Sequence, residues 1–586
     1  MNEMRTGTRS EAQAVVDWLA SFEAALALGT DAALRRVLWE QELHWRDLMA
    51  FTWTILPHDT LDGAVADLTK MQPVIKARNF CLAEDRTPPR RVMRHGVMSI
   101  EAFFSFETEV ARCSGIVRLV ADEPEKAWVL ATQPDELKGH EEPVGARRPA
   151  GSAYSRNFGG DNWSDNRAKA QAYADRDPAV LIAGAGQAGL AIAARLGLLG
   201  VDTLCVDMRD RVGDIWRERY HSLALHNQVK LNHMPYLPWP PNWPKYLPKD
   251  MIAGWLETYA WAMECNVWTS TVVLGAEYDD AAGLWAVRLR RADGSERVMK
   301  PRHLIMANGV AGKPLRPKLP GLDRFKGTVI HTHDYKDGQM WTGKKVLVVG
   351  AGTSGHDVAQ DLQGRGAHVK IIQRGPATVV SVQAAGLVHS VYYEEDLPLE
   401  DCDMIAAASS YPLLVRSYQA AVEKMKVMDK DLLEGLAARG FKLDWGEDNT
   451  GHQMKFRRRH GGYYLNCGCS DLIISGEVGL IQHEDTDVFV ENGLRMKDGL
   501  VEEADLIVLA TGYQSQESVV REMLGDRIAD RVGQIWGINE LGEIANMFVA
   551  TPQPGLWFTG GGFAHCRIYS HFIAMGIKVR ELGLVK

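Results

Sequence analysis

The sequence predicts an α/β protein with two parallel-sheet units, preceded by a smaller α+β domain. Three observations carry this prediction. Strand and helix patterns alternate from residue 178 onward, an apolar strand runs into a glycine-rich turn at two places in that region, and helices precede strands within residues 1–140. Alternating strands and helices are typical of doubly wound parallel sheets, whereas segregated elements are typical of α+β domains.

The first 140 residues begin with a helix pattern and continue with strand patterns. An apolar stripe predicts a helix over residues 12–29, with Ser10 as its cap and Gly29 at its end. Apolar alternation around residues 98–106 and strand-like runs at 115–121 and 128–132 predict a sheet. In element order this segment resembles the NTF2-like (SnoaL-like) fold, a curved sheet wrapped by helices. Residues 141–177 have little periodicity, which predicts a linker.

The first glycine-rich turn follows an apolar strand at residues 179–183. The turn and the start of the next helix supply Gly184, Gly186, Gln187, Ala188 and Gly189. In such a G-x-G-x-x-G turn the first glycine makes the bend, the second lets the backbone approach a pyrophosphate, and the third packs helix on strand. Asp207 and Met208 end the next strand, where a carboxylate can accept both ribose hydroxyls. The segment therefore predicts a dinucleotide site.

The same pattern recurs after the apolar run at residues 345–349. Its turn and helix start supply Gly350, Gly352, Thr353, Ser354 and Gly355. Counting the same spacing as from Gly184 to Asp207 leads to Gln373, followed by Arg374. A neutral residue followed by an arginine can accept a 2′-phosphate that an acid would repel. This favours NADPH at the second turn and FAD at the first. Gln373 can also bind an unmodified ribose, so NADH use stays open.

Residues 325–335 fit the pattern F-x-G-x-x-x-H-x-x-x-[YF] at every fixed position. Ile215 and Trp216 end a segment that resembles G-G-x-W, residues 510–513 with Thr511, Gly512 and Tyr513 match A-T-G-Y, and Gly560 ends a segment similar to one that closes on a flavin. With these motifs the region from 178 to 586 resembles the class B flavin monooxygenases, specifically the flavin-containing monooxygenases. Asp214 and Asn308 depart from the family pattern, which leaves details of flavin contact open.

The resemblance implies two Rossmann-like dinucleotide-binding domains behind the NTF2-like domain. The FAD-binding domain is predicted at 178–340 and 500–586, and the NAD(P)H-binding domain at 341–499, with a helical insertion at about 380–470. The implied activity transfers one oxygen atom of O2 to a small organic substrate through a C4a-(hydro)peroxyflavin, by N- or S-oxygenation or ketone oxidation. The N-terminal extension and Gln373–Arg374 resemble the longer second type of these enzymes.

Alternatives stay open at this point. A dedicated Baeyer–Villiger monooxygenase carries an arginine in a segment that here reads Arg219 to Ala224, and that arginine has no evident counterpart. A flavoprotein that is an NAD(P)H oxidase or a redox sensor is the other alternative. A disulfide reductase needs a redox cysteine pair beside the flavin, and the sequence has none.

Three residues are candidates for a catalytic role. The family often supports oxygen chemistry with an asparagine near the flavin, and Asn227 and Asn232 follow Trp216 in the chain. His331, in the fingerprint at 325–335, could act as a base. A histidine that links the two nucleotide domains through hydrogen bonds fits its position better.

Charge and composition bound the remaining function classes. The chain has 66 basic and 75 acidic residues, a net charge of −9, which does not favour nucleic acid as a partner. The basic run at 456–460 is therefore interpreted as a solvated face. The eight cysteines show no metal-ligand or disulfide spacing, and no long apolar run is present. We expect a cytoplasmic homodimer without a metal or a membrane segment.

Overall fold

The predicted first helix is confirmed in the computed structural model, which describes residues 10–150, 158–309 and 312–585. Helix α1 (Glu11–Leu28) begins where the hydroxyl of Ser10 accepts a hydrogen bond from the backbone N–H of Gln13 at 3.2 Å. It ends at Gly29, whose φ of 60° is left-handed. The apolar stripe, including Trp18 and Phe22, is fully buried against the following sheet.

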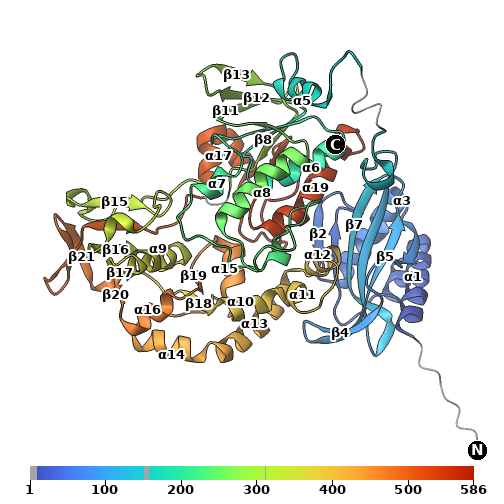
Figure 1. Cartoon of the computed structure of the whole chain (residues 1–586). Coiled ribbons are helices and arrows are strands. Elements are labelled where there is room, and N and C mark those ends of the chain that lie inside the picture. The colour runs from blue at the N-terminus through green and yellow to red at the C-terminus, as the bar shows by residue number, and fades with distance from the viewer. Residues whose placement is uncertain (1–9, 151–157, 310–311, 586) are drawn as a thin grey trace, which may run out of the picture.

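The N-terminal unit is a seven-stranded mixed sheet with helices on one face, drawn in blue in Figure 1. Its remaining elements are α2 (Asp31–Arg35), α3 (Leu61–Ile75), β1 (His44–Leu48), β2 (Ile55–His58), β3 (Arg78–Leu82), β4 (Arg90–Arg94), β5 (Val97–Glu107), β6 (Ala111–Val120) and β7 (Glu123–Leu137). The long strands β5, β6 and β7 confirm the three predicted strands. The likeness to the NTF2-like fold stays a prediction.

The predicted linker contains one short helix. In α5 (Trp163–Ala172), Asn162 and Asp165 form a reciprocal capping box. The indole of Trp163 donates to the carboxylate of Glu264 at 2.8 Å, which fastens the segment to the first parallel-sheet unit.

The first parallel sheet has the order β10-β9-β8-β14-β25. Its elements are β8 (Val180–Ala183), α6 (Gln187–Leu198), β9 (Thr203–Val206), β10 (Asn266–Trp268), β14 (His303–Met306) and β25 (Leu556–Phe558). Helices α7 (Asp214–Arg217), α8 (Lys249–Ala262) and α19 (Phe563–Glu581) accompany it, with a small antiparallel sheet of β11 (Val272–Asp279), β12 (Leu284–Arg290) and β13 (Glu296–Met299). Helix α19 packs along α6, as Figure 1 shows in red and green.

The second parallel sheet has the order β15-β24-β16-β17-β20. Its elements are β15 (Thr328–His331), β16 (Lys345–Val349), α9 (Thr353–Gly364), β17 (His368–Gln373), β20 (Val478–Gln482) and β24 (Leu506–Leu509), with α16 (Cys469–Ser475) on it and β21 (Thr486–Val490), β22 (Gly493–Met496) and β23 (Val501–Glu503) beside it. Strands β15 and β24 lie outside the predicted range 341–499. They join this sheet because β24 pairs in parallel with both β16 and β15.

Residues 378–466 bring a helical layer to the second sheet. It contains β18 (Thr378–Ser381), α10 (Val382–Ala385), α11 (Ser390–Tyr393), α12 (Leu399–Ala407), α13 (Tyr411–Met428), α14 (Lys430–Ala438), α15 (Gly451–Arg459) and β19 (Tyr463–Asn466). Met404 and Ile405 of α12 pack on Phe103 and Trp128 of the N-terminal sheet. The layer thus reaches from the second sheet to the N-terminal unit, along the lower edge of Figure 1.

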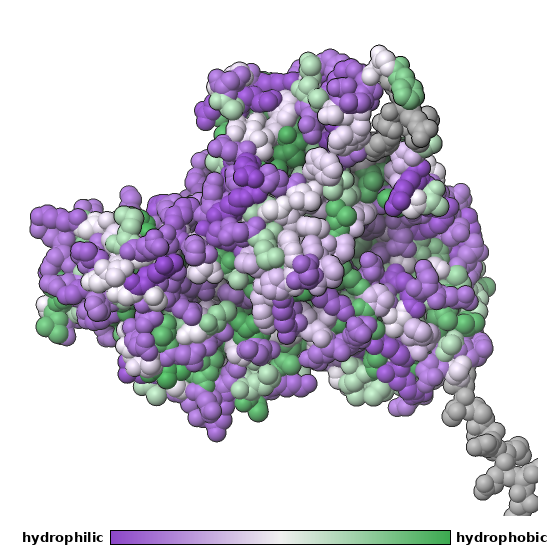
Figure 2. All heavy atoms as spheres, in the orientation of Figure 1, coloured by the Kyte–Doolittle hydropathy of each residue, from purple (hydrophilic) through white to green (hydrophobic). Residues whose placement is uncertain are grey.

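The α17 (Gln516–Leu524) and α18 (Asp526–Val532) helices lead the chain back from the second sheet to the first. Together, two parallel sheets and a mixed α/β architecture confirm the predicted fold class. The face in Figure 2 is mainly hydrophilic, with small, separate apolar patches. Across the described ranges, every helix falls short of the length and apolarity that a bilayer span requires.

Candidate functional site

A cavity of about 2090 Å³ joins the carboxyl ends of the two parallel sheets. Most of the predicted site residues line it: Gly184, Gly186, Gln187, Ala188, Asp207, Met208, Ile215, Trp216, Asn227, Gly350, Gly352, Thr353, Ser354, Gly355, Arg374, Thr511, Gly512, Tyr513 and Gly560. Four do not: Gly189, Asn232, His331 and Gln373. Ligands of open parallel sheets bind at this edge, so the cavity is the candidate site.

The first glycine turn is shaped for close approach. Gly184 has a φ of +114°, and a side chain there would overlap the carbonyl of Ala307 on the neighbouring strand end. A side chain at Gly189 would overlap the carbonyl of Gly184, so its absence lets α6 pack on β8. A methyl group at Gly186 would meet only Ile215, at 3.9 Å. The space over Gly186 is therefore left for a ligand group.

The second turn repeats this geometry. Gly350 has a φ of +121° and closely approaches the carbonyl of Ala510, and Gly355 closely approaches the carbonyl of Gly350. Above Gly352 there is nothing within 4 Å. Both α6 and α9 begin at these turns and point their free N–H groups and positive dipole ends at the open space. Each turn fits the pyrophosphate of a dinucleotide.

Around the first turn, the side chains hold one another in place. The carboxylate of Asp207 accepts the backbone N–H of Ala185 at 2.8 Å and stays on the cavity wall at the end of β9. The indole of Trp216 donates to the side-chain oxygen of Gln187 at 3.2 Å, and its ring stacks on Phe563 of α19. The turn, the short helix α7 and the C-terminal helix therefore form one rigid wall.

Gln373 does not face the cavity, contrary to the predicted ribose contact. Its amide nitrogen donates to the carbonyl of Lys442 at 2.8 Å, and its oxygen accepts from the N–H of Lys442 and from Gln482. The side chain is completely buried, because these contacts tie β17 to the loop before residue 443 and to β20. The residue at this position is structural.

Two arginines on the second half of the cavity are available for an anion. Arg374 and Arg459 are exposed, line the cavity, and within the described part of the chain have no hydrogen bond or ion pair. Arg459 belongs to the basic run at 456–460, which is therefore not a solvated face alone. Its neighbour Arg458 is held by Asp448 at 2.5 Å.

The two candidate asparagines differ in position. Asn227 lines the cavity. Asn232 is buried, and its amide donates to the carbonyls of Asn227 and Gln228 at 3.0 and 3.1 Å. Asn232 therefore closes a turn that presents Asn227, and only Asn227 can reach a ligand in the cavity.

His331 is fully buried behind the cavity wall. One ring nitrogen accepts the N–H of His333 at 3.0 Å, so the other carries the proton and donates to the carbonyl of Gly512 at 3.1 Å. Burial lowers the pKa of His331 and keeps the ring neutral. With both nitrogens engaged, His331 fixes the loop after β24 against β15 and is not placed as a base.

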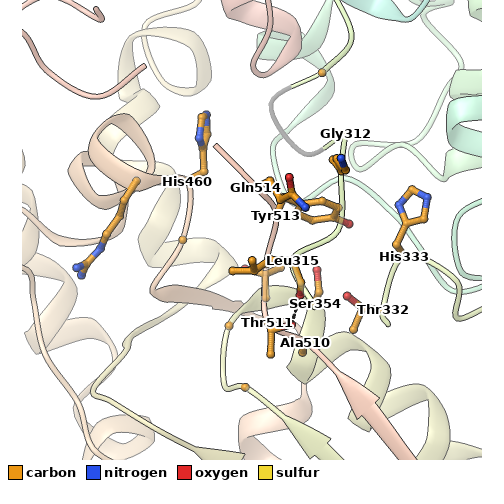
Figure 3. Close-up of a pocket in the computed structure, with 18 of the residues that line it drawn as sticks. Gly312, Leu315, Thr332, His333, Ser354, His460, Ala510, Thr511, Tyr513 and Gln514 are labelled. Atoms are coloured by element: carbon orange, nitrogen blue, oxygen red, sulfur yellow. Dashed lines mark hydrogen bonds between the residues drawn. The ribbon is translucent and has the colours of Figure 1, made fainter. Parts of the chain in front are cut away.

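His333 and Tyr513 present polar groups that the protein does not satisfy. The Nδ1 of His333 and the hydroxyl of Tyr513 are buried without a hydrogen-bond partner among the described residues, and the two rings meet edge-on at 6.3 Å. In Figure 3, Tyr513 lies between His333 and His460, below Gly312. Sequence reasoning missed His333, although it stands inside the fingerprint at 325–335.

Two linked nucleotide turns opening on one cavity define a flavin-dependent oxidoreductase that uses a second dinucleotide. Residues 178–532 match the family model described as flavin-binding monooxygenase-like, and the chain belongs to this family. It is an enzyme of the flavin-containing monooxygenase type, as the motifs predicted. The family model does not extend to the N-terminal unit.

Relatives and solved structures agree with this assignment. The chain is 32% identical over 342 residues to indole-3-pyruvate monooxygenase YUCCA1 of Oryza sativa subsp. japonica, covering 58% of this chain and 77% of that protein. Its fold is similar to cyclohexanone monooxygenase from Rhodococcus sp. Phi1 bound to NADP+, with a TM-score of 0.51, 18% identity and coverage of 70% and 84%. It is also similar to OTEMO in complex with FAD and NADP, with a TM-score of 0.52, 16% identity and coverage of 70% and 87%. FAD and NADPH are the cofactors that this family and the two turns support.

Proposed function

We propose that the protein is an NADPH-dependent FAD monooxygenase that transfers one oxygen atom of O2 to a small organic substrate. The observation that carries the proposal is the pair of open glycine turns on one cavity, with a methyl-sized space over Gly186 and over Gly352. When bound, the nicotinamide supplies a hydride and the flavin uses it to activate O2, with the second oxygen atom leaving as water.

We propose that FAD lies on the first turn. The N–H groups at the start of α6 hold its pyrophosphate, and Asp207 accepts its ribose hydroxyls. Trp216, locked by Gln187 and Phe563, and Gly560 wall the flavin side of the cavity. Asn227 is the residue we place nearest the reacting atoms, as a donor to developing negative charge on oxygen.

We propose that NADPH lies on the second turn, with Thr353 and Ser354 at its pyrophosphate. Arg374 and Arg459 supply charge-assisted contacts to the 2′-phosphate, since both are unpaired and exposed to the cavity. Thr511 helps to shape the boundary between the two sites by donating to the carbonyl of Leu315 at 2.6 Å (Figure 3). Gly512 and Tyr513 form the loop that His331 fixes.

The reaction class is proposed as N- or S-oxygenation or ketone oxidation. The position that would match the Baeyer–Villiger arginine is Ala224, which lines the cavity and carries no charge. We therefore treat a dedicated Baeyer–Villiger enzyme, an oxidase and a redox sensor as alternatives that one experiment separates.

The test supplies purified, FAD-loaded protein with NADPH, ¹⁸O2 and a panel of amines, sulfides and ketones. We expect NADPH to reduce the flavin anaerobically and one ¹⁸O atom to appear in at least one product by mass spectrometry. Lactones or esters formed only from ketones would indicate the Baeyer–Villiger alternative. Release of all consumed O2 as H2O2 with every compound would contradict a monooxygenase.

We also propose a cytoplasmic homodimer. Its N-terminal unit, which the family model does not cover, would supply the contact between copies. Light scattering of the full chain at several concentrations tests the dimer, and a constant monomer mass would exclude it.

A further inference from the structure

An arginine without an acid partner lies behind the wall of the cavity. Arg457, on α15, has a completely buried Nε with no hydrogen-bond partner. Among the described residues no carboxylate forms an ion pair with it. The groups that act on its charge are the phenols of Tyr418 and Tyr569 and the guanidinium of Arg46. Because Arg46 is itself paired with Glu543, at 2.6 Å, the nearby acid is already used.

Histidines surround this arginine instead of acids. His389 and His565 lie next to Arg457; burial, and then the charge of Arg457, lower their pKa values to about 4 and about 3. Neither ring has a hydrogen bond within the described ranges. His452, only 4% exposed, has an unpartnered Nδ1 and lies near His389. Four basic side chains therefore meet here, and their polar atoms are not satisfied by the protein.

This cluster borders the proposed flavin site. Gly561 follows Gly560 on the cavity wall, and a methyl group added to it would lie 3.4 Å from both His565 and Trp536. Trp536 also lines the cavity, and Phe456 packs edge-on against it at 5.5 Å. Aromatic rings thus cover the path from the flavin loop to the buried arginine.

We propose that Arg457, with His389 and His565, binds the carboxylate of an organic acid substrate whose apolar body lies toward Trp536. A buried guanidinium without a counter-ion is costly, and a ligand carboxylate removes that cost through a two-pronged, charge-assisted contact. The neutral histidines can each donate one N–H to the same oxyanion. The surrounding aromatic rings favour an apolar or aromatic body.

The phosphates of NADPH are not the anion for this site. Arg457 and Arg459 are two positions apart on α15, and residues at that spacing point to different sides of a helix. Arg459 faces the cavity, whereas Arg457 points to the histidine cluster. The two arginines therefore serve different ligands, and each provides a control for the other.

The inference rests on the proposed function, and its test separates the two. FAD-loaded full-length protein is titrated with phenylacetate and 3-phenylpropionate and with their neutral amides, and binding is followed by the flavin difference spectrum. Anaerobic reduction by NADPH is measured on the same samples. Failure of that reduction contradicts the proposed function, whereas normal reduction without a preference for the acids contradicts only the carboxylate site.

We expect at least one acid to bind at least about 10-fold more tightly than its amide. Arg457→Gln removes that preference, a loss of about 10- to 100-fold for a charged contact, and Arg457→Lys restores part of it. Arg459→Gln weakens NADPH and leaves the preference for the acid intact. Equal binding of acids and amides, or an unchanged preference in an Arg457→Gln protein that retains its FAD, would overturn the proposal.

Discussion

The paired variants Gly186→Ala and Gly352→Ala test the assignment of the two cofactors to the two turns. The change adds one methyl group at equivalent positions. At Gly186 the nearest atom is 3.9 Å away, and at Gly352 nothing lies within 4 Å. Both residues are helix N-caps with extended backbone, so alanine fits there. Replacing an N-cap residue by alanine costs about 1 kcal/mol in unfolding free energy, and the fold should survive.

The effect on cofactor binding should be much larger. The methyl group occupies the space through which the backbone N–H groups approach the pyrophosphate. Losing one or two such charge-assisted hydrogen bonds costs about 1.5–3 kcal/mol each, which is about 10-fold or more in affinity for each bond. We expect Gly186→Ala to lose FAD and Gly352→Ala to keep FAD but to require far more NADPH.

The assay is the flavin-to-protein absorbance ratio after desalting, together with the NADPH dependence of anaerobic flavin reduction. Gly189→Ala serves as the contrasting variant, because its methyl group would overlap the carbonyl of Gly184 and should destabilise the fold itself. If Gly352→Ala loses FAD, or if Gly186→Ala retains it with unchanged affinity, the assignment is wrong.

Three further predictions concern single side chains. Arg374→Gln should raise the KM for NADPH about 10-fold or more and leave NADH unchanged, because only the 2′-phosphate contact is lost; equal effects in steady-state assays would contradict this. Arg46→Met should lower the unfolding free energy by about 3–5 kcal/mol, since Glu543 would stay largely buried without its partner; urea unfolding measures it, and adding Glu543→Gln should recover part of the loss. Burial lowers the pKa of His356 to about 4, against an ordinary value of 6.5. As pH falls below 6.5 the unfolded chain takes up a proton that the folded chain resists, so stability falls by up to about 1.4 kcal/mol per pH unit until about pH 4. His356→Gln should flatten that slope in urea midpoints, and an unchanged slope would show that His356 is not responsible.

Local features of the fold could be predicted from the sequence. The helix at 12–29 and the two glycine turns depend on interactions within a few residues, such as Ser10 with Gln13. The approach of Gly184 to Ala307 is long-range, yet the turn motif already contains it because only glycine fits there. These elements therefore appear where the patterns place them.

Features set by distant partners could not be predicted. Counting positions placed Gln373 at the ribose, but its side chain is used by Lys442 and Gln482, which are 69 and 109 residues away in sequence. The basic run at 456–460 looked like one solvated face because its charges are consecutive. On a helix, consecutive residues point to different sides, so Arg457, Arg458 and Arg459 have three different environments.

The N-terminal unit is tied to the active-site region through one of these buried charges. Arg46 donates from its sheet to the carboxylate of Glu543, to the carbonyl of Ala407 on α12, and to the hydroxyl of Tyr569 at 3.3 Å. Tyr569 is also one of the groups that act on Arg457. Loss of the Arg46 contacts should therefore loosen the wall that positions Arg457 as well as the docking of the unit. Arg46→Met should then weaken phenylacetate binding more than FAD binding, and an equal loss of both would indicate general unfolding instead.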